Sequence, residues 1–561
     1  MFKEAICMVQ GMADIAIVGL RILLSFYAVF IVYHCFASMR RHKRPEKPLL
    51  MLYNNRFDIK IPVLFWENSI GRAKGSDIVI EDGTVSRSHC VLLRRKAGWF
   101  INDTGSKSGT KVNGTPVMGR TQVFINDVIT IGGTSLTLLR GEEYQEDIRP
   151  SWFFSKVSRK PSVPSALLLI LVNLFHLFMT CELCITTNSF NLNALTIFGA
   201  VTLFSWVLYA FSYGVFGRKN FELETLALWL TGLGSLLLVE QEMSDAIVQV
   251  VSAVAGAVLY MAMLMFIKNP DRVIKWRWAI MIAAIGFLAV NLAFGTIEYG
   301  AANRIYIGGI SVQPSEIVKI AYIFVGAASL DYLQTRRNFL EFIIFSAMCV
   351  GALALMGDFG TALIFFATFI VISITRSGDY KTVILALVGA AFAVLLILNF
   401  KPYIAERFSI WGHALDDPYD LGYQQAGTLT SIASGGLFGT GVGSGNLRYY
   451  GASETDLVFG IVSEEMGLII AITIALSICG LVFYSRAITT RSRSTFYSIS
   501  ACCAATLLLV QMSLNIFGCT DILPLTGVTL PFVSAGGSSM LSCWGLLAFI
   551  KAADERTYKA G

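Results

Sequence analysis

Apolar stretches recur along most of the chain, and short polar segments separate them. A helix of about 20 apolar residues crosses a bilayer, and at that length roughly thirteen stretches qualify. The first covers about 15–38, and the others follow residue 163. Their approximate centres are Leu171, Phe204, Thr231, Val254, Ile285, Ile323, Met348, Thr368, Val388, Thr473, Leu507 and Cys543. The pattern predicts a polytopic α-helical membrane protein with about 13 transmembrane helices.

Residues 47–141 follow a different pattern, in which short β-prone runs alternate with Gly, Asp, Asn and Ser. The runs are 49–57, 61–66, 78–80, 90–94, 99–102 and 128–139. Several short strands with frequent turns are typical of a β-sandwich. We therefore expect an inserted all-β domain, followed by a polar linker at 142–162.

Composition agrees with a membrane protein. Hydrophobic residues make up 55% of the chain and charged residues 15%, against about 25% charged in soluble proteins. The net charge is only +6, and Lys and Arg recur in short runs between apolar stretches, a pattern that does not indicate nucleic-acid binding. The CxxC pair Cys181 and Cys184 ends an apolar run without other ligands nearby, so two helix-face thiols are favoured over a redox or metal site.

Loop charge predicts the topology. The first apolar stretch, interrupted by Arg21 where that side chain could snorkel, is followed rather than preceded by the basic run 40–44. This order indicates a signal anchor with its N-terminus outside. Basic loops near 218, 268–277, 336, 376–381, 486–493 and 551–559 then fall on the cytoplasmic side with the β domain and the C-terminus. The loop at about 401–455 falls outside.

Asp456 lies where this long polar loop meets an apolar run. A carboxylate at a membrane border is costly and is usually functional. A substrate with a polar head and a lipid tail would meet such a group. The alternative is a carboxylate placed near a helix N-terminus because the helix dipole favours it there.

Several motifs occur along the same region in a fixed order. They are 304–319, 356–361, 401–407, 417–418, 422–424, 434–443, 451–467 and 524–539. Together they resemble the SEDS family, typified by FtsW, RodA and SpoVE, over about 222–553. The resemblance implies a ten-helix core at 218–561, two extra helices at 163–217, and 1–46 as the anchor segment. It also implies a peptidoglycan glycosyltransferase that polymerises lipid II, an undecaprenyl-pyrophosphate-linked disaccharide pentapeptide, outside the plasma membrane.

The resemblance assigns roles to individual residues. The family's essential Asp falls on Asp456, and other motif positions fall on Glu316, Lys319 and Asp358. Glu316 and Lys319 are three residues apart on one helix, so they can pair. Such a pair is either structural or part of a polar cavity, and the cavity is favoured. The chain departs from the family at Glu454, where His is usual.

Glycosyl transfer needs a base for the acceptor hydroxyl and positive charge or a metal for the departing pyrophosphate. Asp456 suits the first role, and Arg304, Lys319 and Arg407 are candidates for the second. Ser534 begins a helix break that either is covered by protein or lines a polar cavity; the chain has Ala535 where the family usually has an aromatic residue. No cofactor is expected with certainty, and a divalent cation is a further candidate.

The β region carries four short motifs at 71–72, 86–89, 103–110 and 112–114. This set resembles the forkhead-associated (FHA) domain, a β-sandwich that binds phosphothreonine peptides. The resemblance implies that Arg72 and Ser86 contact the phosphate, that Asn113 holds peptide backbone, and that His89 braces loops. The implied phosphothreonine-binding residues are Arg72, Ser86, Arg87, Lys107, Ser108 and Asn113. The alternative is an FHA fold that no longer binds phosphopeptide.

The expected protein is thus a membrane polymerase with a cytoplasmic phosphothreonine sensor. The resemblance implies three partners: lipid II, a membrane transpeptidase of the class B penicillin-binding type, and a phosphothreonine protein of a Ser/Thr kinase pathway. Two alternatives are a lipid II flippase and an inactive scaffold that recruits phosphorylated cell-division or sporulation proteins. A polar cavity would serve polymerisation and flipping alike.

Overall fold

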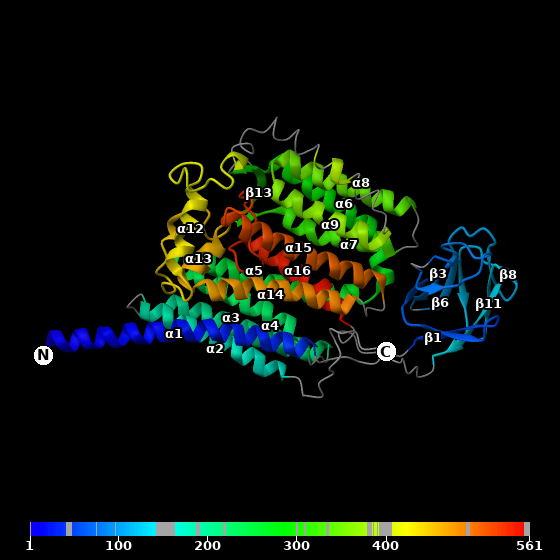
Figure 1. The fold of residues 1–561 in the computed structure, drawn as a ribbon, viewed down its shortest axis with the longest axis horizontal. Helices are drawn as coiled ribbons and strands as arrows, with labels where there is room; N and C mark the ends of the chain where they lie inside the picture. Colours follow the sequence, from blue (N-terminus) through cyan, green and yellow to red (C-terminus); the bar gives the residue numbers. More distant parts are fainter. Residues whose placement is uncertain are drawn as a thin grey trace.

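The computed structural model describes residues 2–40, 48–73, 76–95, 97–141, 163–186, 191–216, 220–298, 301–307, 310–331, 336–377, 384, 386–389, 391, 407–489 and 494–554. These residues form a helical membrane domain and a β domain (Figure 1). The expected linker at 142–162 and much of the expected span near Val388 lie outside the described residues.

Long apolar helices build the membrane domain. Within the described ranges, nine are long and apolar enough to span a bilayer, and Phe359–Ile374 and Gly537–Ala553 are shorter apolar helices. The helices are α1 (Phe2–Arg40), α2 (Ser165–Thr186), α3 (Leu192–Phe216), α4 (Glu222–Leu237), α5 (Met243–Ile267), α6 (Pro270–Phe294), α7 (Pro314–Asp331), α8 (Arg336–Met356), α9 (Phe359–Ser377), α12 (Tyr423–Gly435), α13 (Val458–Glu465), α14 (Leu468–Thr489), α15 (Thr495–Cys519) and α16 (Gly537–Ala553), with 3₁₀ turns at Leu238–Glu240 and Leu447–Tyr449. The predicted polytopic helical class is confirmed.

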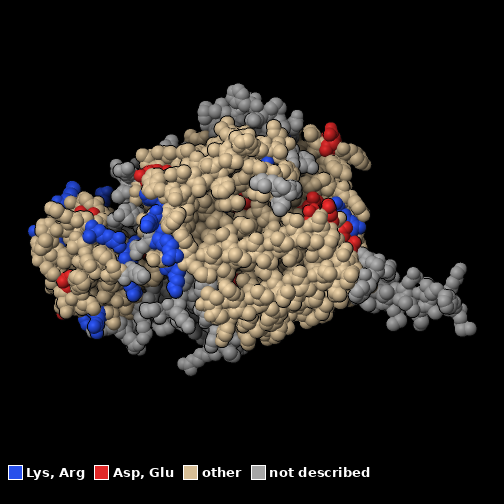
Figure 2. Space-filling view, turned by 180° about the vertical axis from the view of Figure 1, so that it is seen from behind, with Lys and Arg blue, Asp and Glu red and all other residues tan. Residues whose placement is uncertain are grey.

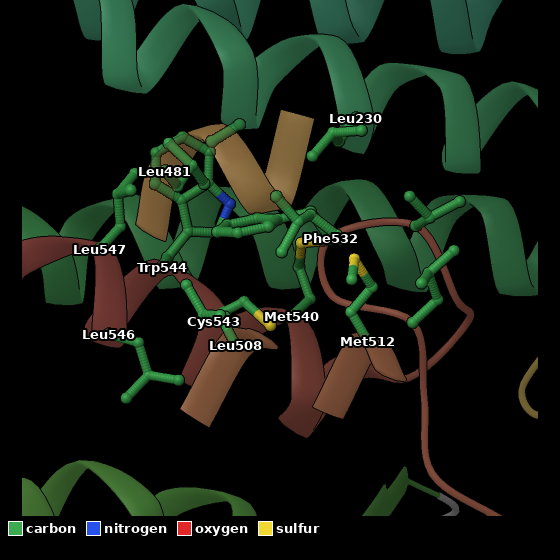
Figure 3. Packing of buried hydrophobic residues seen from close by; sticks show 14 of the residues in the cluster. Leu230, Leu481, Leu508, Met512, Phe532, Met540, Cys543, Trp544, Leu546 and Leu547 are labelled. Carbon is green, nitrogen blue, oxygen red and sulfur yellow. The ribbon is translucent and has the colours of Figure 1, made fainter. Parts of the chain in front are cut away.

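The centre of the helical domain packs around Trp544 of α16 (Figure 3). Its ring is fully buried and meets Phe204, Tyr260 and Phe532 edge to face at 5.9–6.1 Å between centroids. Gly256 of α5 faces this ring, and a Cβ there would lie 3.0 Å from Trp544. A residue without a side chain therefore lets α5 and α16 approach closely, as is common between membrane helices.

A three-stranded sheet stands between α6 and α7. Its strands are β12 (Thr296–Glu298), β13 (Ala301–Ile307) and β14 (Ile310–Val312), paired antiparallel in that order. The sequence analysis did not predict it. The signal was present, because Gly308-Gly309 separates two runs of alternating polarity, which is typical of a hairpin turn.

The β domain is a sandwich of two sheets, as predicted. One sheet has the order β2-β1-β11-β10-β7-β8 and the other β4-β3-β5-β6-β9. The strands are β1 (Leu50–Asn54), β2 (Ile59–Val63), β3 (Glu67–Gly71), β4 (Ile78–Val79), β5 (Cys90–Arg95), β6 (Gly98–Asp103), β7 (Thr110–Val112), β8 (Thr115–Pro116), β9 (Arg120–Val123), β10 (Val128–Ile131) and β11 (Thr134–Arg140). Their inward residues, among them Leu52, Ile70, Leu92, Ile101 and Leu136, form a separate apolar core.

The β domain contacts the start of α15. A carboxylate oxygen of Glu67, on β3, accepts a hydrogen bond from the amide of Thr495 at 3.0 Å. The other oxygen pairs with Arg95, and both side chains are buried. Trp66 meets the ring of Tyr497 edge to face at 6.0 Å. A carboxylate at a helix N-terminus satisfies an amide that has no partner within the helix, so Glu67 caps α15 from another domain.

Surface charge is distributed along the molecule. Figure 2 shows Lys and Arg gathered where the β domain meets the helices, and acidic groups near the opposite end. The broad surface between them carries few charges. The membrane helices expose apolar side chains such as Val258, Ile282 and Leu476. An apolar surface of this kind suits contact with lipid.

Candidate active site

Asp456 lies in the turn before α13, at the end of the helices opposite the β domain (Figure 1). The turn closes where the amide of Asp456 donates to the carbonyl oxygen of Ala452 at 2.9 Å. The N-cap residue of α13 is Leu457, and no side-chain cap bond is present there. The carboxylate of Asp456 is near the positive end of the helix dipole but is not used as a hydrogen-bonded cap.

Three groups hold this turn by its backbone. The side-chain amide of Asn515, on α15, donates to the carbonyl oxygen of Asp456 at 2.9 Å. The hydroxyl of Ser534 donates to the carbonyl oxygen of Thr455 at 2.6 Å. The amide of Ala535 donates to the carbonyl oxygen of the preceding residue in the turn at 2.9 Å. Because these bonds use main-chain oxygens, they fix the turn and leave the carboxylate of Asp456 available for chemistry.

Charged groups of both signs surround the Asp456 carboxylate. Burial raises its pKa, and the neighbouring carboxylate of Glu454 adds to this effect. The hydroxyl of Thr455 and the guanidinium groups of Arg304 and Arg407 act in the opposite direction. Arg304 comes from β13, and Arg407 donates to the carbonyl oxygen of Leu525 at 3.1 Å. Thus the structure brings together the expected base and two of the three expected pyrophosphate-binding cations.

Gly527 lies directly against the carboxylate. Its backbone has a φ of +67°, and a Cβ added there would lie 3.3 Å from Oδ2 of Asp456. The left-handed conformation favours glycine, and any side chain would crowd the carboxylate. The segment that carries Ser534 therefore also shapes the space around Asp456.

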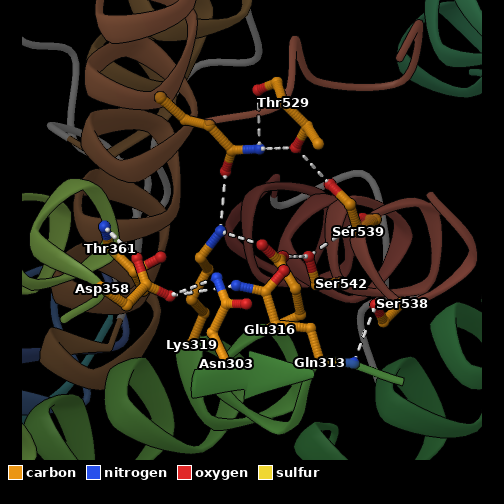
Figure 4. Close-up of polar contacts among 11 residues, drawn as sticks. Asn303, Gln313, Glu316, Lys319, Asp358, Thr361, Thr529, Ser538, Ser539 and Ser542 are labelled. Atoms are coloured by element: carbon orange, nitrogen blue, oxygen red, sulfur yellow. Dashed lines mark hydrogen bonds and ion pairs between the residues drawn. The ribbon is translucent and has the colours of Figure 1, made fainter. Parts of the chain in front are cut away.

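Lys319, the third candidate cation, is placed differently. Its ammonium group is fully buried and donates to Glu316 at 2.7 Å and to the side-chain oxygen of Gln511 at 3.1 Å (Figure 4). The other oxygen of Glu316 accepts from the hydroxyl of Ser542, on α16, at 2.6 Å. These bonds favour the structural alternative for the pair over the cavity that the sequence analysis favoured.

Asp358 forms a second polar cluster beside this network (Figure 4). One carboxylate oxygen accepts from the amide of Thr361 at 3.1 Å and caps α9. The other accepts from the side-chain amides of Gln313 at 3.1 Å and Asn303 at 3.4 Å. Asp358 therefore ties α9 to β13, the strand that carries Arg304.

Helix α15 joins these parts. Gln511 binds Lys319 and also donates to the carbonyl oxygen and hydroxyl of Thr529 at 3.1 and 3.0 Å. Asn515, one turn further along, binds the Asp456 turn and the carbonyl oxygen of Val528. The sequence analysis missed both residues. Two polar side chains four residues apart in an apolar helix were the available signal.

The side chains of Glu464 and Glu465 accept hydrogen bonds from main-chain amides. The carboxylate of Glu464 accepts from the amides of Asn446 and Leu447 at 2.9 and 3.0 Å, and that of Glu465 from Gly443 and Gly445 at 2.9 and 3.3 Å. Burial raises the pKa of Glu465 to about 7, a value suited to a general base. Both of its oxygens, however, accept bonds from the glycine-rich loop at 436–447, so geometry favours Asp456 as the base.

Metal ligands do not gather anywhere in the described structure. No three His, Cys, Asp or Glu side chains are placed to share an ion among those residues. The positive charge near Asp456 comes from the two guanidinium groups.

The expected phosphothreonine site lies on loops of the β domain. The amide of Lys107 donates to the hydroxyl oxygen of Ser86 at 3.0 Å, and the amide of Arg72 donates to the carbonyl oxygen of the same residue. Arg72, Arg87 and Lys107 expose their side chains. The loops around Ser86 therefore bring together the cations that a phosphate would need.

His89 and the remaining predicted residues hold these loops. Buried His89 accepts from the amide of Ser86 at 3.1 Å and contacts the carbonyl oxygen of Gly109, as a bracing residue would. Ser108 donates to the carbonyl oxygen of Thr84 at 3.0 Å. Asn113 uses its side chain on Asp127 and on the amide of Val128, so in this structure it stabilises a turn within the domain.

Comparisons with known proteins agree with both parts. The family model for FtsW, RodA and SpoVE, described as cell cycle protein, matches residues 226–559, and the FHA domain model matches 68–132. The chain is 28% identical over 337 residues to the probable peptidoglycan glycosyltransferase FtsW of Bacillus subtilis, covering 55% of this chain and 83% of that protein. It is 31% identical over 290 residues to stage V sporulation protein E of the same organism, covering 49% and 78%.

A solved structure has the same membrane fold. A chain from a study of polymerization and crosslinking by a peptidoglycan synthase complex superposes with a TM-score of 0.51 at 23% identity, covering 61% of this chain and 99% of that one. At this identity the likeness shows the fold alone.

The buried pair provides a stability test. Lys319→Met leaves the Glu316 carboxylate without its cation, which should destabilise the protein by about 3–5 kcal/mol. The double variant Lys319→Met/Glu316→Gln removes both charges, so it should lose less stability than Lys319→Met alone. Unfolding of the purified proteins in detergent measures the difference. A double variant at least as unstable as Lys319→Met alone would contradict a coupled pair.

Proposed function

Because the chain belongs to the FtsW/RodA/SpoVE family of cell cycle proteins, we propose that this peptidoglycan glycosyltransferase polymerises lipid II with Asp456 as its base. One observation carries the assignment of the base. The turn of Asp456 is clamped through main-chain oxygens by Asn515 and Ser534, while its carboxylate faces the electrostatic field of Arg304 and Arg407.

The reaction follows from these positions. The acceptor hydroxyl attacks the anomeric carbon of the donor, and its proton passes to the carboxylate of Asp456. A new carbon–oxygen bond forms as the bond from the anomeric carbon to the pyrophosphate oxygen breaks. The departing lipid pyrophosphate keeps the electron pair, and Arg304 and Arg407 stabilise its charge, as preorganised cations do. A divalent cation bound with the pyrophosphate would assist the same step.

The remaining predicted residues support this centre. Asp358 positions β13 and hence Arg304, and Ser534 positions the catalytic turn. Glu316 and Lys319 hold α7 against α15 and α16. We assign these four residues to positioning rather than to contact with lipid II.

The membrane orientation is part of the proposal. With the basic surface beside the β domain on the cytoplasmic side, the Asp456 turn lies on the outer side with the N-terminus. Polymerisation then occurs outside, where a transpeptidase of the class B penicillin-binding type would crosslink the product. The FHA domain binds a phosphothreonine protein inside, downstream of a Ser/Thr kinase.

Two other functions fit parts of the structure. A flippase would use the polar groups at this end of the helices but needs no base. A scaffold would use the FHA domain without the guanidinium groups near Asp456. The polymerase is favoured because Asp456, Arg304 and Arg407 supply a base and charge stabilisation in one place.

Asp456→Asn should lower lipid II polymerisation at least about 100-fold, because the amide cannot accept the proton. The pH profile gives a second readout. Burial raises the pKa of Asp456, so wild-type activity should fall on acidification with a midpoint above the about 3.9 of an ordinary Asp. Purified protein and fluorescent lipid II in liposomes measure both, with Asp416→Asn, at an exposed loop carboxylate, as the control. Full activity of Asp456→Asn would refute the assignment.

Topology can be tested by cysteine labelling in intact cells with a membrane-impermeant maleimide. Tyr419→Cys, at a side chain that is 92% exposed, should react from outside. Thr115→Cys, exposed on the β domain, should react only after lysis. Labelling of Thr115→Cys in intact cells would overturn the orientation and the cytoplasmic sensor.

Phosphopeptide recognition can be tested on the full-length protein in detergent. A phosphothreonine peptide should bind, and its unphosphorylated twin should not. Arg72→Ala removes charge-assisted hydrogen bonds worth about 1.5–3 kcal/mol each, which is roughly a tenfold to hundredfold loss per bond. Calorimetry against a phosphothreonine peptide library measures this. If no peptide binds more tightly when it is phosphorylated, the FHA fold has another role here.

A further inference from the structure

The glycine-rich loop at 436–447 surrounds the far end of α13. The amides of Thr440 and Gly441 donate to the carbonyl oxygens of Glu464 and Glu465 at 2.8 and 2.9 Å. The side chains of the same two glutamates accept from amides further along the loop, as described above. Loop and helix end are therefore bound by both main chain and side chain. Any shift of the loop is passed to α13.

Arg21 of α1 reaches this loop. Its Nη1 donates to the carbonyl oxygen of Gly439 at 3.3 Å, and its Nε pairs with Oε1 of Glu182, on α2, at 3.2 Å. The Glu182 side chain is 2% exposed and that of Arg21 18%. The sequence suggested that Arg21 could snorkel; in the structure its guanidinium binds protein groups. A charged pair inside membrane helices is costly and is usually kept for function.

Gly441 shows how closely Arg21 is fitted. A Cβ added to this glycine would lie 2.2 Å from Nη2 of Arg21, and its φ is +116°. The guanidinium therefore occupies the place where a side chain would stand. The contact is specific to this turn of the loop rather than a general charge attraction.

The side chains that reach the loop from α1 and α2 lie outside the part of the chain that the family model matches. Arg21 and Glu182 precede residues 226–559, the range that the FtsW/RodA/SpoVE model matches. The loop, α13 and Asp456 all lie inside that range. The added helices α1 and α2 thus contact a loop of the core that is bound to the end of α13 farther from Asp456.

We propose that Arg21 is a positioning residue for the glycosyl transfer reaction: through Gly439 and the glycine-rich loop it fixes the axis of α13, and so the place of Asp456. This inference rests on the proposed function. Helix α13 has eight residues, which is about 12 Å, and a tilt of about 10° moves one end by about 2 Å relative to the other. A misplacement of about 1 Å can slow catalysis about 100-fold.

The test compares variants of the full-length protein in liposomes. Arg21→Met keeps an apolar helix and removes both polar contacts. It should lower kcat for lipid II polymerisation about tenfold to hundredfold and leave KM within about twofold, as expected when only the reacting geometry changes. Arg21→Lys keeps the charge and should recover part of the rate.

The control is Ser38→Ala, at the other end of α1. It removes a buried hydrogen bond of 2.8 Å to Glu222 of α4 and does not touch the loop. If Arg21 merely anchors α1, the two variants should lose similar activity. Selective loss with Arg21→Met supports positioning, and equal loss overturns it.

Hydrogen exchange separates this inference from the proposed function. In Arg21→Met the amides of 439–447 and 458–465 should exchange faster, while those of 524–535 stay unchanged. Unchanged exchange in the loop overturns the proposal. If the wild type does not polymerise lipid II, the proposed function fails, yet exchange still shows whether Arg21 holds α13. If Arg21→Met does not fold, hydrogen exchange of Arg21→Lys and Glu182→Gln tests whether Arg21 holds α13.

Discussion

A lysine ammonium buried among apolar helices must find all its hydrogen-bond partners in the protein, and the site is arranged around that requirement. Lys319 directs two of its N–H donors to Glu316 from its own helix and Gln511 from α15. Both partners extend the network, since Glu316 also binds α16 and Gln511 also binds Thr529. Three helices and the segment before α16 are locked together, so the turn of Asp456 rests on a rigid support.

Sequence reasoning recovered the fold class and the ends of this network, but not the parts that join them. The resemblance of the motifs to the family pointed to Asp456, Glu316 and Asp358, and the position of Asp456 between a polar loop and an apolar run pointed to it independently. Asn515 was missed because its side chain binds a main-chain oxygen 59 residues away in sequence, and no local pattern predicts that contact. The sequence suggested only that Arg21 could snorkel, because its partner Glu182 comes close to it only when α1 and α2 pack.

In the turn of Asp456, two residues at which the chain departs from the family, Glu454 and Ala535, contact each other through the backbone. The contact between these two residues joins an amide to a carbonyl oxygen, so it does not depend on either side chain. Geometry is carried by the backbone, and charge by Arg304 and Arg407. Substitutions at Glu454 and Ala535 therefore alter the shape of the surroundings rather than the placement of Asp456.

The carboxylate of Glu67 fixes the orientation of the FHA domain relative to the membrane helix α15. Glu67 is the first residue of β3, and Arg72 follows the last residue of that strand. A domain on a flexible tether samples every direction, and its ligand is diluted over the whole volume that the tether sweeps. A domain docked on α15 presents its loops in one direction and at one height. A protein bound there would be concentrated over a defined patch of the bilayer. The FHA domain would then set the position of its partner as well as bind it.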